Sequence, residues 1–171
     1  MREIPGMVVI NPCDDTEAKA AVKAAYEHVG PVYMRFGRLA LPVINDPDTY
    51  KFELGKGVEL KSGKDITIVA TGLCVSESLK AAEMLKEAGV DAQVINIHTI
   101  KPIDEDIIIN AAKKTGRIFT VEEHSIIGGL GSAVMEVLSE KYPTKVTGIG
   151  VNDTYGCSGP AKELLLSLIH I

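Results

Sequence analysis

Two glutamates and a histidine come directly before a glycine-rich turn in the stretch VEEHSIIGGLGSAVMEVL, residues 121–138. Side chains alternate along a strand, so Glu122 and His124 share one side if the strand expected at 117–122 continues. A carboxylate beside an imidazole can orient the ring, and such a pair can act as a general acid or base. A pair of this kind is more often a hydrogen bond at a surface or interface, and the sequence leaves both interpretations open.

The glycines of this stretch allow two further interpretations, a phosphate-binding loop or a turn that seats a helix. The segment GLGSAV is close to the dinucleotide fingerprint G-x-G-x-x-G/A, but Val134 occupies the place of its third small residue. Residues 124–128 also separate the strand from Gly129, whereas the fingerprint opens directly off a strand. We therefore expect a turn whose small residues let the next helix approach the sheet, with Val134, Val137 and Leu138 packed beneath it.

A second group of candidates is the arginine pair in GPVYMRFGR, residues 30–38. Arg35 and Arg38 lie at or just past the end of an expected strand, where a guanidinium group could hold a phosphate. The alternative is an ion pair with Asp46 or Asp48, and the residue chemistry alone favours this alternative.

The remaining residues suggest no self-sufficient active site. The sequence contains no Walker motif, no H-E-x-x-H pair, no G-x-S-x-G elbow and no evident three-ligand metal set. His98 directly follows an expected strand, and we interpret it as a structural histidine. Cys13, Cys74 and Cys157 form no C-x-x-C pair, so the sequence indicates neither a disulfide framework nor a thiolate zinc site.

Composition excludes several classes of partner. The formal net charge is −5, and the 18 lysines and arginines are scattered rather than clustered. Nucleic acids and anionic membranes bind to basic patches, so neither is expected as a partner. No apolar run approaches the ~20 residues that span a bilayer. The cysteine pattern fits a reducing compartment, and we expect a cytoplasmic location.

Hydrophobic periodicity predicts alternating strands and helices. Residues 7–11, 14–30 and 31–36 read as a strand, a helix and a second strand, while residues 38–64 read as a connector with a hairpin near 52–60. The strands expected beyond it are 66–71, 92–97, 117–122 and 145–151, and the helices are 75–88, 104–114 and one that begins near 129. This alternation predicts a parallel sheet with helices on both faces.

Four segments taken together resemble the transketolase family. They are the stretch from IPGMVVINPCDD to MRFGR at 4–38, INIHTIKPID at 95–104, TVEEHSIIGGLGSAVMEVL at 120–138 and GVNDTYGCSG at 150–159. Their order is that of the carboxyl-terminal portion of a transketolase. The likeness is greatest to the split bacterial and archaeal type, in which two polypeptides make the enzyme.

The resemblance implies a domain organisation and an activity. Residues 64–165 would form the transketolase C-terminal domain, an α/β fold that is a three-layer α/β/α sandwich with a mostly parallel sheet. Residues 1–42 would be a β-α-β remnant of the pyrimidine-binding domain, 43–63 a linker, and 166–171, LSLIHI, a truncation or sequencing-adaptor scar. The family transfers two-carbon ketol units between sugar phosphates with thiamine diphosphate and a divalent metal, Mg or Ca.

The resemblance also assigns roles to particular residues. Arg38 falls on the arginine of an R-x-x-L-P-like element, which in the family contacts the substrate phosphate. Glu122, Glu123 and His124 match a family motif without a settled catalytic role, and we carry them as candidates for a domain contact or the edge of a site. No catalytic, cofactor-binding or metal-binding residue is assigned to this chain.

Two parts of the family's machinery are missing from the sequence. The glutamate that activates the cofactor and the G-D-G signature that binds metal and diphosphate both belong to other regions or subunits. The chain alone is therefore expected to be inactive and to bind neither thiamine diphosphate nor its metal. Its expected partners are the remaining transketolase domains or an N-terminal subunit, in a homodimer-type assembly.

Three alternatives stay open beside transketolase. Two are relatives in the same superfamily, 1-deoxyxylulose-5-phosphate synthase and the beta subunit of 2-oxo-acid dehydrogenases. The motifs EEH, GGLG and MRFGR resemble transketolase more than either of them. The third alternative is a non-catalytic assembly or regulatory module, which is suggested by the missing cofactor machinery.

Overall fold

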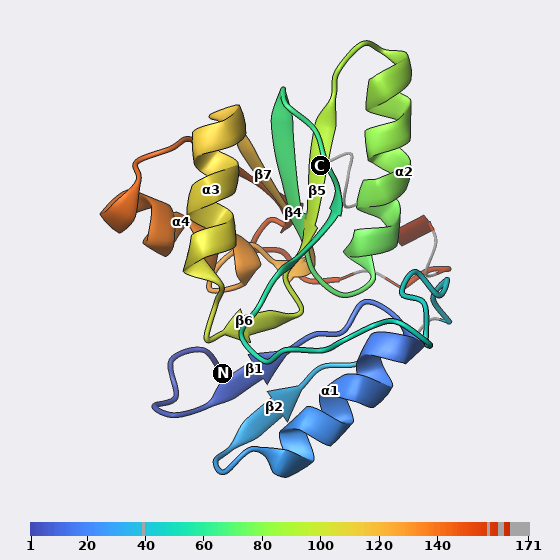
Figure 1. Cartoon of the computed structure of the whole chain (residues 1–171), viewed down its shortest axis with the longest axis vertical. Helices are drawn as coiled ribbons and strands as arrows, with labels where there is room; N and C mark the ends of the chain where they lie inside the picture. The colour runs from blue at the N-terminus through green and yellow to red at the C-terminus, as the bar shows by residue number, and fades with distance from the viewer. Residues whose placement is uncertain (39, 157, 161–162, 165–171) are drawn as a thin grey trace.

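A five-stranded, mostly parallel sheet forms the centre of the larger part of the protein (Figure 1). The computed structural model describes residues 1–38, 40–156, 158–160 and 163–164, so the scar expected at 166–171 lies outside the described residues. The strand order is β3-β5-β4-β7-β8. The parallel strands are β4 (Ile66–Ala70), β5 (Ala92–Asn96), β7 (Ile118–Ser125) and β8 (Val146–Val151). The edge strand β3 (Val58–Lys61) is antiparallel to β5.

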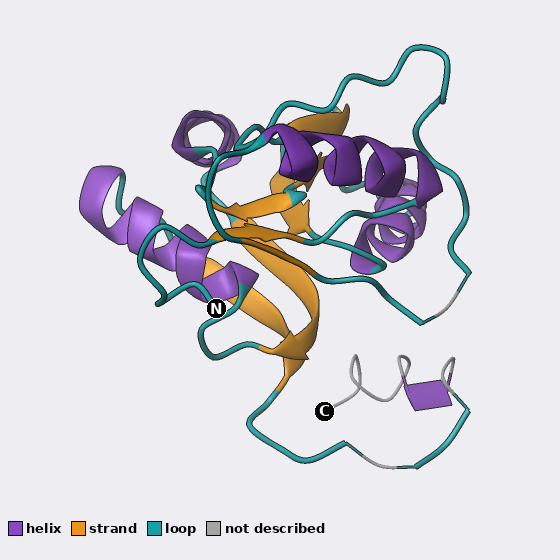
Figure 2. Cartoon of the chain, turned by 90° about the horizontal axis from the view of Figure 1, so that it is seen from below, coloured by secondary structure: helices purple, strands orange, loops and turns teal. Residues whose placement is uncertain are grey.

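Helices cover both faces of this sheet. Helix α2 (Cys74–Glu87) lies on one face, and α3 (Glu105–Thr115) and α4 (Leu130–Lys141) lie on the other. The view from below in Figure 2 also shows helices on both sides of the strands. This arrangement confirms the expected three-layer α/β/α sandwich.

The core explains why the strands read as apolar runs rather than as alternating patterns. Strand β5 is buried along its whole length because helices cover both of its faces. One cluster, between the sheet and α3 and α4, contains Val69, Ile95, Ile108, Ile118, Leu130 and Leu138. Another, on the α2 side, contains Ile68, Ala82, Ala92 and Val94. None of the described helices is long and apolar enough to cross a membrane.

A smaller sheet holds the amino-terminal part of the chain. Strand β1 (Val8–Ile10), helix α1 (Asp15–Glu27) and strand β2 (Val32–Met34) form a parallel β-α-β unit, which confirms the expected order of these three elements. The third strand, β6 (Thr99–Lys101), pairs antiparallel with β1. Because β6 follows β5 after two residues, the chain passes directly from the larger sheet into the smaller one.

The sequence interpretation was wrong about one short element and missed another. No hairpin forms near 52–60, because β3 pairs with β5 rather than with a neighbouring segment. Strand β3 therefore belongs to the large sheet although it lies in the segment expected to be a linker. Strand β6 was not expected at all. Both strands are too short to show a period, and their pairing depends on distant partners.

Two buried carboxylates fix the start of α1. Asp14 caps the helix by accepting the backbone N–H of Glu17 at 2.8 Å, and it also accepts the N–H groups of Ile44 and Asn45 at 2.8 and 2.7 Å. The fully buried Glu17 accepts the Cys13 N–H at 2.7 Å, the Tyr50 hydroxyl at 2.5 Å and the Asn96 amide at 2.9 Å. This cluster joins α1, the irregular segment after β2 and the end of β5.

Replacing Glu17 tests this cluster. Glu17→Ala leaves three donors without their acceptor, each at a cost of about 1–3 kcal/mol. We expect the free energy of unfolding to fall by at least about 3 kcal/mol in urea denaturation. The control is Glu27→Ala at the exposed end of the same helix, which should change it by less than about 0.5 kcal/mol. Equal losses in the two variants would contradict the role of Glu17.

His98 is a structural histidine buried between the two sheets. Its ring stacks on Phe52 with centroids 4.3 Å apart, and its Nδ1 lies 2.9 Å from the Thr99 hydroxyl. Only 1% of the residue is exposed. Burial lowers the pKa of His98 because it disfavours the charged ring, and this outweighs the opposite effect of Glu17 and Asp104.

This pKa shift predicts a loss of stability in mild acid. The pKa of His98 is lower in the folded state than its unfolded value of about 6.5, so its contribution is complete above that pH and declines as the pH falls below it. Urea denaturation should show that the free energy of unfolding falls less between about pH 7.5 and about pH 5 in His98→Gln than in the wild type. The control His28→Gln should keep the wild-type difference, and a His98→Gln variant that also keeps it would refute the assignment.

Candidate functional site

The carboxylate of Glu122 receives the first turn of α4. Its Oε2 accepts the backbone N–H of Leu130 at 2.7 Å, and its Oε1 accepts that of Gly131 at 2.8 Å. The first N–H groups of a helix have no partner within the helix, and a negative charge there also interacts favourably with the helix dipole. Glu122, which is 2% exposed, occupies the position that a bound phosphate would otherwise take. The glycine-rich turn therefore seats a helix, as expected.

Glycine is required where the turn meets this carboxylate. A Cβ atom at Gly129 would lie 1.9 Å from Glu122 Oε2, and one at Gly131 would lie 2.8 Å from Thr120 Oγ1. Larger residues at these two positions would push α4 away from its acceptor. The expected packing beneath the helix is confirmed, because Val134, Val137 and Leu138 are buried.

His124 lies on the same side of β7 as Glu122, as the strand alternation predicted. Its Nδ1 is 3.0 Å from Glu122 Oε2 and 3.2 Å from the carbonyl oxygen of Ser125. Both neighbours of Nδ1 are acceptors, so this nitrogen carries a proton. Glu122 therefore orients the imidazole and leaves Nε2 free of that contact.

Arg35 pairs with Glu123 rather than with the expected aspartates. Arg35 Nη2 is 2.8 Å from Glu123 Oε1, and the side chains are 32% and 19% exposed. The expected pairing with Asp46 or Asp48 was wrong, because the carboxylate of Asp46 accepts hydrogen bonds from the Asp48 N–H and the Thr49 hydroxyl. The ion pair connects the end of β2, in the small sheet, to β7, in the large sheet.

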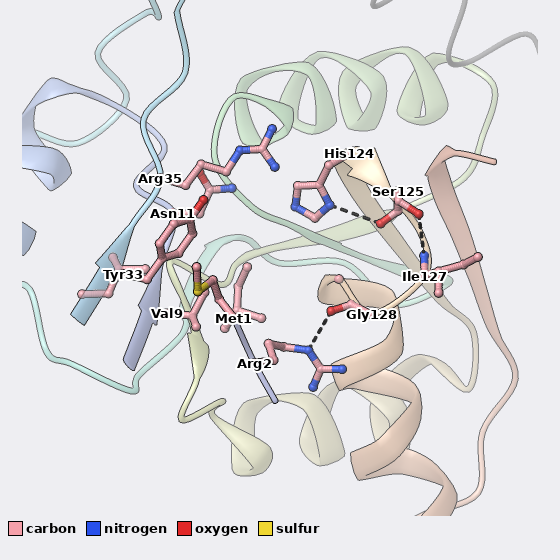
Figure 3. Close-up of a pocket in the computed structure, with 13 residues that line it drawn as sticks. Met1, Arg2, Val9, Asn11, Tyr33, Arg35, His124, Ser125, Ile127 and Gly128 are labelled. Atoms are coloured by element: carbon pink, nitrogen blue, oxygen red, sulfur yellow. Dashed lines mark hydrogen bonds between the residues drawn. The ribbon is translucent and has the colours of Figure 1, made fainter. Parts of the chain in front are cut away.

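A cavity of about 250 Å³ lies between the small sheet and the turn before α4 (Figure 3). Asn11, Arg35 and His124 gather at one end of it, and Arg2 and Gly128 lie at the other. The rest of the lining is Met1, Val9, Ile10, Tyr33, Ile100, Ser125, Ile127 and Gly129. The geometry thus brings Arg35 and His124 together, along with residues that no sequence motif marks.

A bidentate ion pair holds the Arg2 side chain at the other end of the cavity. Arg2 donates from Nη1 and Nη2 to the carboxylate of Glu136 at 2.9 and 2.8 Å, and from Nε to the carbonyl of Gly128 at 2.9 Å. The hydrogen bond from Arg2 lowers the pKa of Glu136. Sequence reasoning passed over Arg2, Asn11 and Tyr33 because each is a common residue type without a motif.

Arg38 stands apart from this group. It is exposed, it does not line the cavity, and it makes no hydrogen bond or ion pair with the described residues. Within the described part of the chain, no group of three or more His, Cys, Asp or Glu side chains could hold a metal ion.

The fold defines the class of domain, and sequence and structure comparisons agree with it. Residues 55–169 match the family model "Transketolase, C-terminal domain". The structure described as "Split gene transketolase, inactive beta4 tetramer" has a TM-score of 0.95 and 48% identity, over 98% of this chain and 55% of that chain. The chain belongs to the transketolase C-terminal domain family.

Two curated relatives show the range of this family. A 6-deoxy-6-sulfo-D-fructose transketolase subunit from a Clostridium species is 45% identical over 157 residues, which is 91% of this chain and 48% of the relative. A 1-deoxy-D-xylulose-5-phosphate synthase from Geobacter sulfurreducens is 37% identical over 173 residues, which is 98% of this chain and 27% of the relative. The chain spans about half the length of the first curated relatives that it matches.

Enlarging Gly129 tests the contact between Glu122 and α4. Gly129→Ala places a methyl group 1.9 Å from Glu122 Oε2, so the carboxylate or the helix must move. We expect the free energy of unfolding to fall by about 3 kcal/mol, measured by urea denaturation. The control is Gly148→Ala in β8, where the added Cβ has its nearest neighbour at 3.7 Å, an ordinary contact distance. This variant should change the free energy of unfolding by less than about 1 kcal/mol. A neutral Gly129→Ala would contradict the close approach.

Proposed function

We propose that the chain is the carboxyl-terminal part of a cytoplasmic, thiamine-diphosphate-dependent transketolase. The complete enzyme would transfer two-carbon ketol units between sugar phosphates. The observation that carries this proposal is the family match over residues 55–169, together with a relative named as a transketolase subunit that aligns with 91% of the chain. The chain spans about half the length of these relatives, which supports the proposal that the remaining machinery lies in another segment or subunit.

The small sheet supports a role in assembly. Among the described residues, β2 pairs with β1 alone, so its outer edge is available for another strand. The outer side of α1 and the turn after it expose Val22, Tyr26 and Val29, which are 49%, 90% and 99% exposed. An open strand edge beside exposed apolar side chains is typical of a surface that another protein segment covers. The proposed occupant is the rest of the pyrimidine-binding domain or an N-terminal subunit, within a homodimer-type assembly.

Arg38 is the proposed contact with the substrate phosphate. Its side chain is exposed and has no partner within the described residues, so its donors are available to a ligand. A guanidinium group presents a planar fork of N–H donors that matches a phosphate. Glu122, Glu123 and His124 have a different proposed role, because their contacts position α4 and connect the two sheets.

The cofactor is proposed to bind elsewhere in the complete enzyme. Thiamine diphosphate needs a divalent metal, Mg or Ca, to hold its diphosphate, and such ions take oxygen ligands from several side chains. Among the described residues, no group of three or more His, Cys, Asp or Glu side chains could hold such an ion, which is consistent with a site elsewhere. The chain's own contribution is then assembly and one phosphate contact, and the isolated chain should be inactive.

A second candidate function is 1-deoxyxylulose-5-phosphate synthesis. It is favoured by the relative from Geobacter sulfurreducens, which aligns with 98% of the chain at 37% identity. A non-catalytic assembly or regulatory module is the alternative from another class. The three candidates differ in the substrates that the assembled enzyme uses and in the effect of removing Arg38.

The test combines the purified chain with the segment or subunit encoded beside it. We expect activity with xylulose-5-phosphate and ribose-5-phosphate in the assembled protein and none with the chain alone. Arg38→Ala should raise the KM for the phosphorylated sugars by about tenfold or more with a smaller effect on kcat, because a phosphate contact is shared by the ground and transition states. Arg117→Ala, an exposed arginine after α3, is the control and should leave KM unchanged.

Other outcomes would overturn particular parts of the proposal. If the assembled protein is active only with pyruvate and glyceraldehyde-3-phosphate, the proposed function would be 1-deoxyxylulose-5-phosphate synthesis rather than transketolase activity. An unchanged KM in Arg38→Ala would show that Arg38 does not bind the substrate phosphate, and the proposed role of the chain would then be assembly alone. Tight binding of thiamine diphosphate by the isolated chain would refute the proposal that the cofactor binds elsewhere in the complete enzyme.

A further inference from the structure

An apolar strip runs along the large sheet beside α2. Ile68 in β4 lies directly beside Phe119 in β7, and Val121 in β7 lies beside Ile149 in β8. Residues that pair in this way point to the same side of a sheet. The apolar strip consists of Ile66, Ile68, Phe119, Val121 and Ile149, which line a cavity of about 310 Å³. The other wall of this cavity is formed by residues of α2, namely Glu77, Ser78, Ala81 and Leu85.

The two faces of the large sheet are covered unequally. Helices α3 and α4 share one face, where α4 packs against β7 and β8. Of the three helices α2, α3 and α4, α2 alone lies on the other face. Beside it, Phe119, Val121 and Ile149 are only half-buried, although strands of a parallel sheet are normally covered on both faces. The apolar strip therefore has room for one further covering element.

The carboxyl-terminal segment reaches this side of the sheet. Figure 1 and Figure 2 show the short helical piece at 163–164 on the side on which α2 lies. Its helical turn begins at Pro160, whose carbonyl accepts the N–H groups of Glu163 and Leu164, both at 3.0 Å. Proline is common at the first position of a helix, because its missing N–H would have no partner there. The chain therefore starts a helical turn on the face that carries the apolar strip.

The sequence from this point has the pattern of an amphipathic helix. Residues 160–171 read PAKELLLSLIHI. Leu164, Leu168 and Ile171 recur at spacings of four and three residues, which places them on one face of a helix, whereas Leu166 falls on the opposite face. A helix over 160–171 would be about 18 Å long, which matches the length of strands with five or six residues such as β4 and β8.

We propose that residues 160–171 form a helix that docks on the apolar strip, as a second covering element beside α2. Its apolar face removes Phe119, Val121 and Ile149 from water, and this gain holds the end of the chain on the sheet. The expected scar at 166–171 lies within this segment, and the proposal concerns its apolar side chains rather than its origin. The docking is independent of the proposed transferase activity, because Arg38 does not line this cavity.

A second copy of the chain is the competing occupant of the apolar strip. The connector between β8 and Pro160 is short, so it keeps the segment near the strip at an effective concentration on the order of 1 mM. A second copy must reach a similar concentration in solution to compete. The covalent link therefore favours the segment of the same chain.

The first test compares two matched substitutions. Leu168→Glu places a charge on the docking face of the segment, and Leu166→Glu places the same charge on the opposite face. Leu168→Glu should lower the Tm by about 4 °C or more and raise the fluorescence of the apolar dye ANS, because the strip becomes exposed. Leu166→Glu should leave both values close to those of the wild type. Equal effects of the two substitutions, or no effect of either, would overturn the proposal.

The second test locates the segment by NMR with a spin label. The label is attached at His170→Cys, on the outer side of the proposed helix, in a ¹⁵N-labelled chain that also carries Cys157→Ser. Cys13 and Cys74 are buried, and burial raises the pKa of both thiols, so they react slowly with the label.

The pattern of signal broadening decides between the occupants. We expect strong broadening of the amide signals of Phe119 and Ile149, and little broadening for Ile108 in α3 on the opposite face. Equal broadening on both faces, or none on the strip, would contradict the docking. A mixture of ¹⁵N-labelled chains without the label and labelled chains without ¹⁵N detects contacts between copies. Broadening of the strip in this mixture would assign it to a second copy and refute the proposal.

Discussion

The hydrogen bonds that the Glu122 carboxylate accepts hold the first turn of α4 against β7, and the surrounding structure depends on them. A charged group that is 2% exposed must find hydrogen-bond donors, because burial without them is costly. Glu122 finds them in the first turn of α4 and in His124. The glycines of GGLG let the backbone come close enough, and the apolar face of α4 then reaches the core. One side chain thus fixes a helix, a turn and the orientation of an imidazole.

Buried carboxylates that accept several hydrogen bonds also fix the start of α1, beside the smaller sheet. Asp14 and Glu17 are buried carboxylates that accept backbone and side-chain donors from segments far apart in the sequence. Arg35 and Glu123 then join the two sheets with an ion pair, and β6 joins them through the backbone. The cavity lies where these connections meet, so its shape is set by strong polar contacts rather than by loose loops.

Sequence alone predicted the elements whose patterns are local. The four parallel strands and the helices of the large sheet have apolar runs or helical periods that are long enough to read. The β3 and β6 strands have four and three residues, so only their distant partners define them. The partner of Arg35 lies 88 residues away, whereas Asp46, the nearby candidate, is used within its own turn. Charge and spacing in the sequence could not show that Arg35 pairs with Glu123. The missing partner of the Asn11 amide depends on the residues packed around it, which the sequence does not show.

The exposed apolar side chains of α1 and the buried amide of Asn11 differ in what would satisfy them. Exposed apolar side chains on α1 gain free energy from any apolar surface that removes them from water, and a protein segment of complementary shape can supply one. The amide of Asn11 gains nothing from such a surface, because it needs an acceptor within hydrogen-bond distance. The physical requirements of α1 therefore point to a protein segment, whereas the unpaired donor of Asn11 lies against Gly72 and is sealed inside the fold.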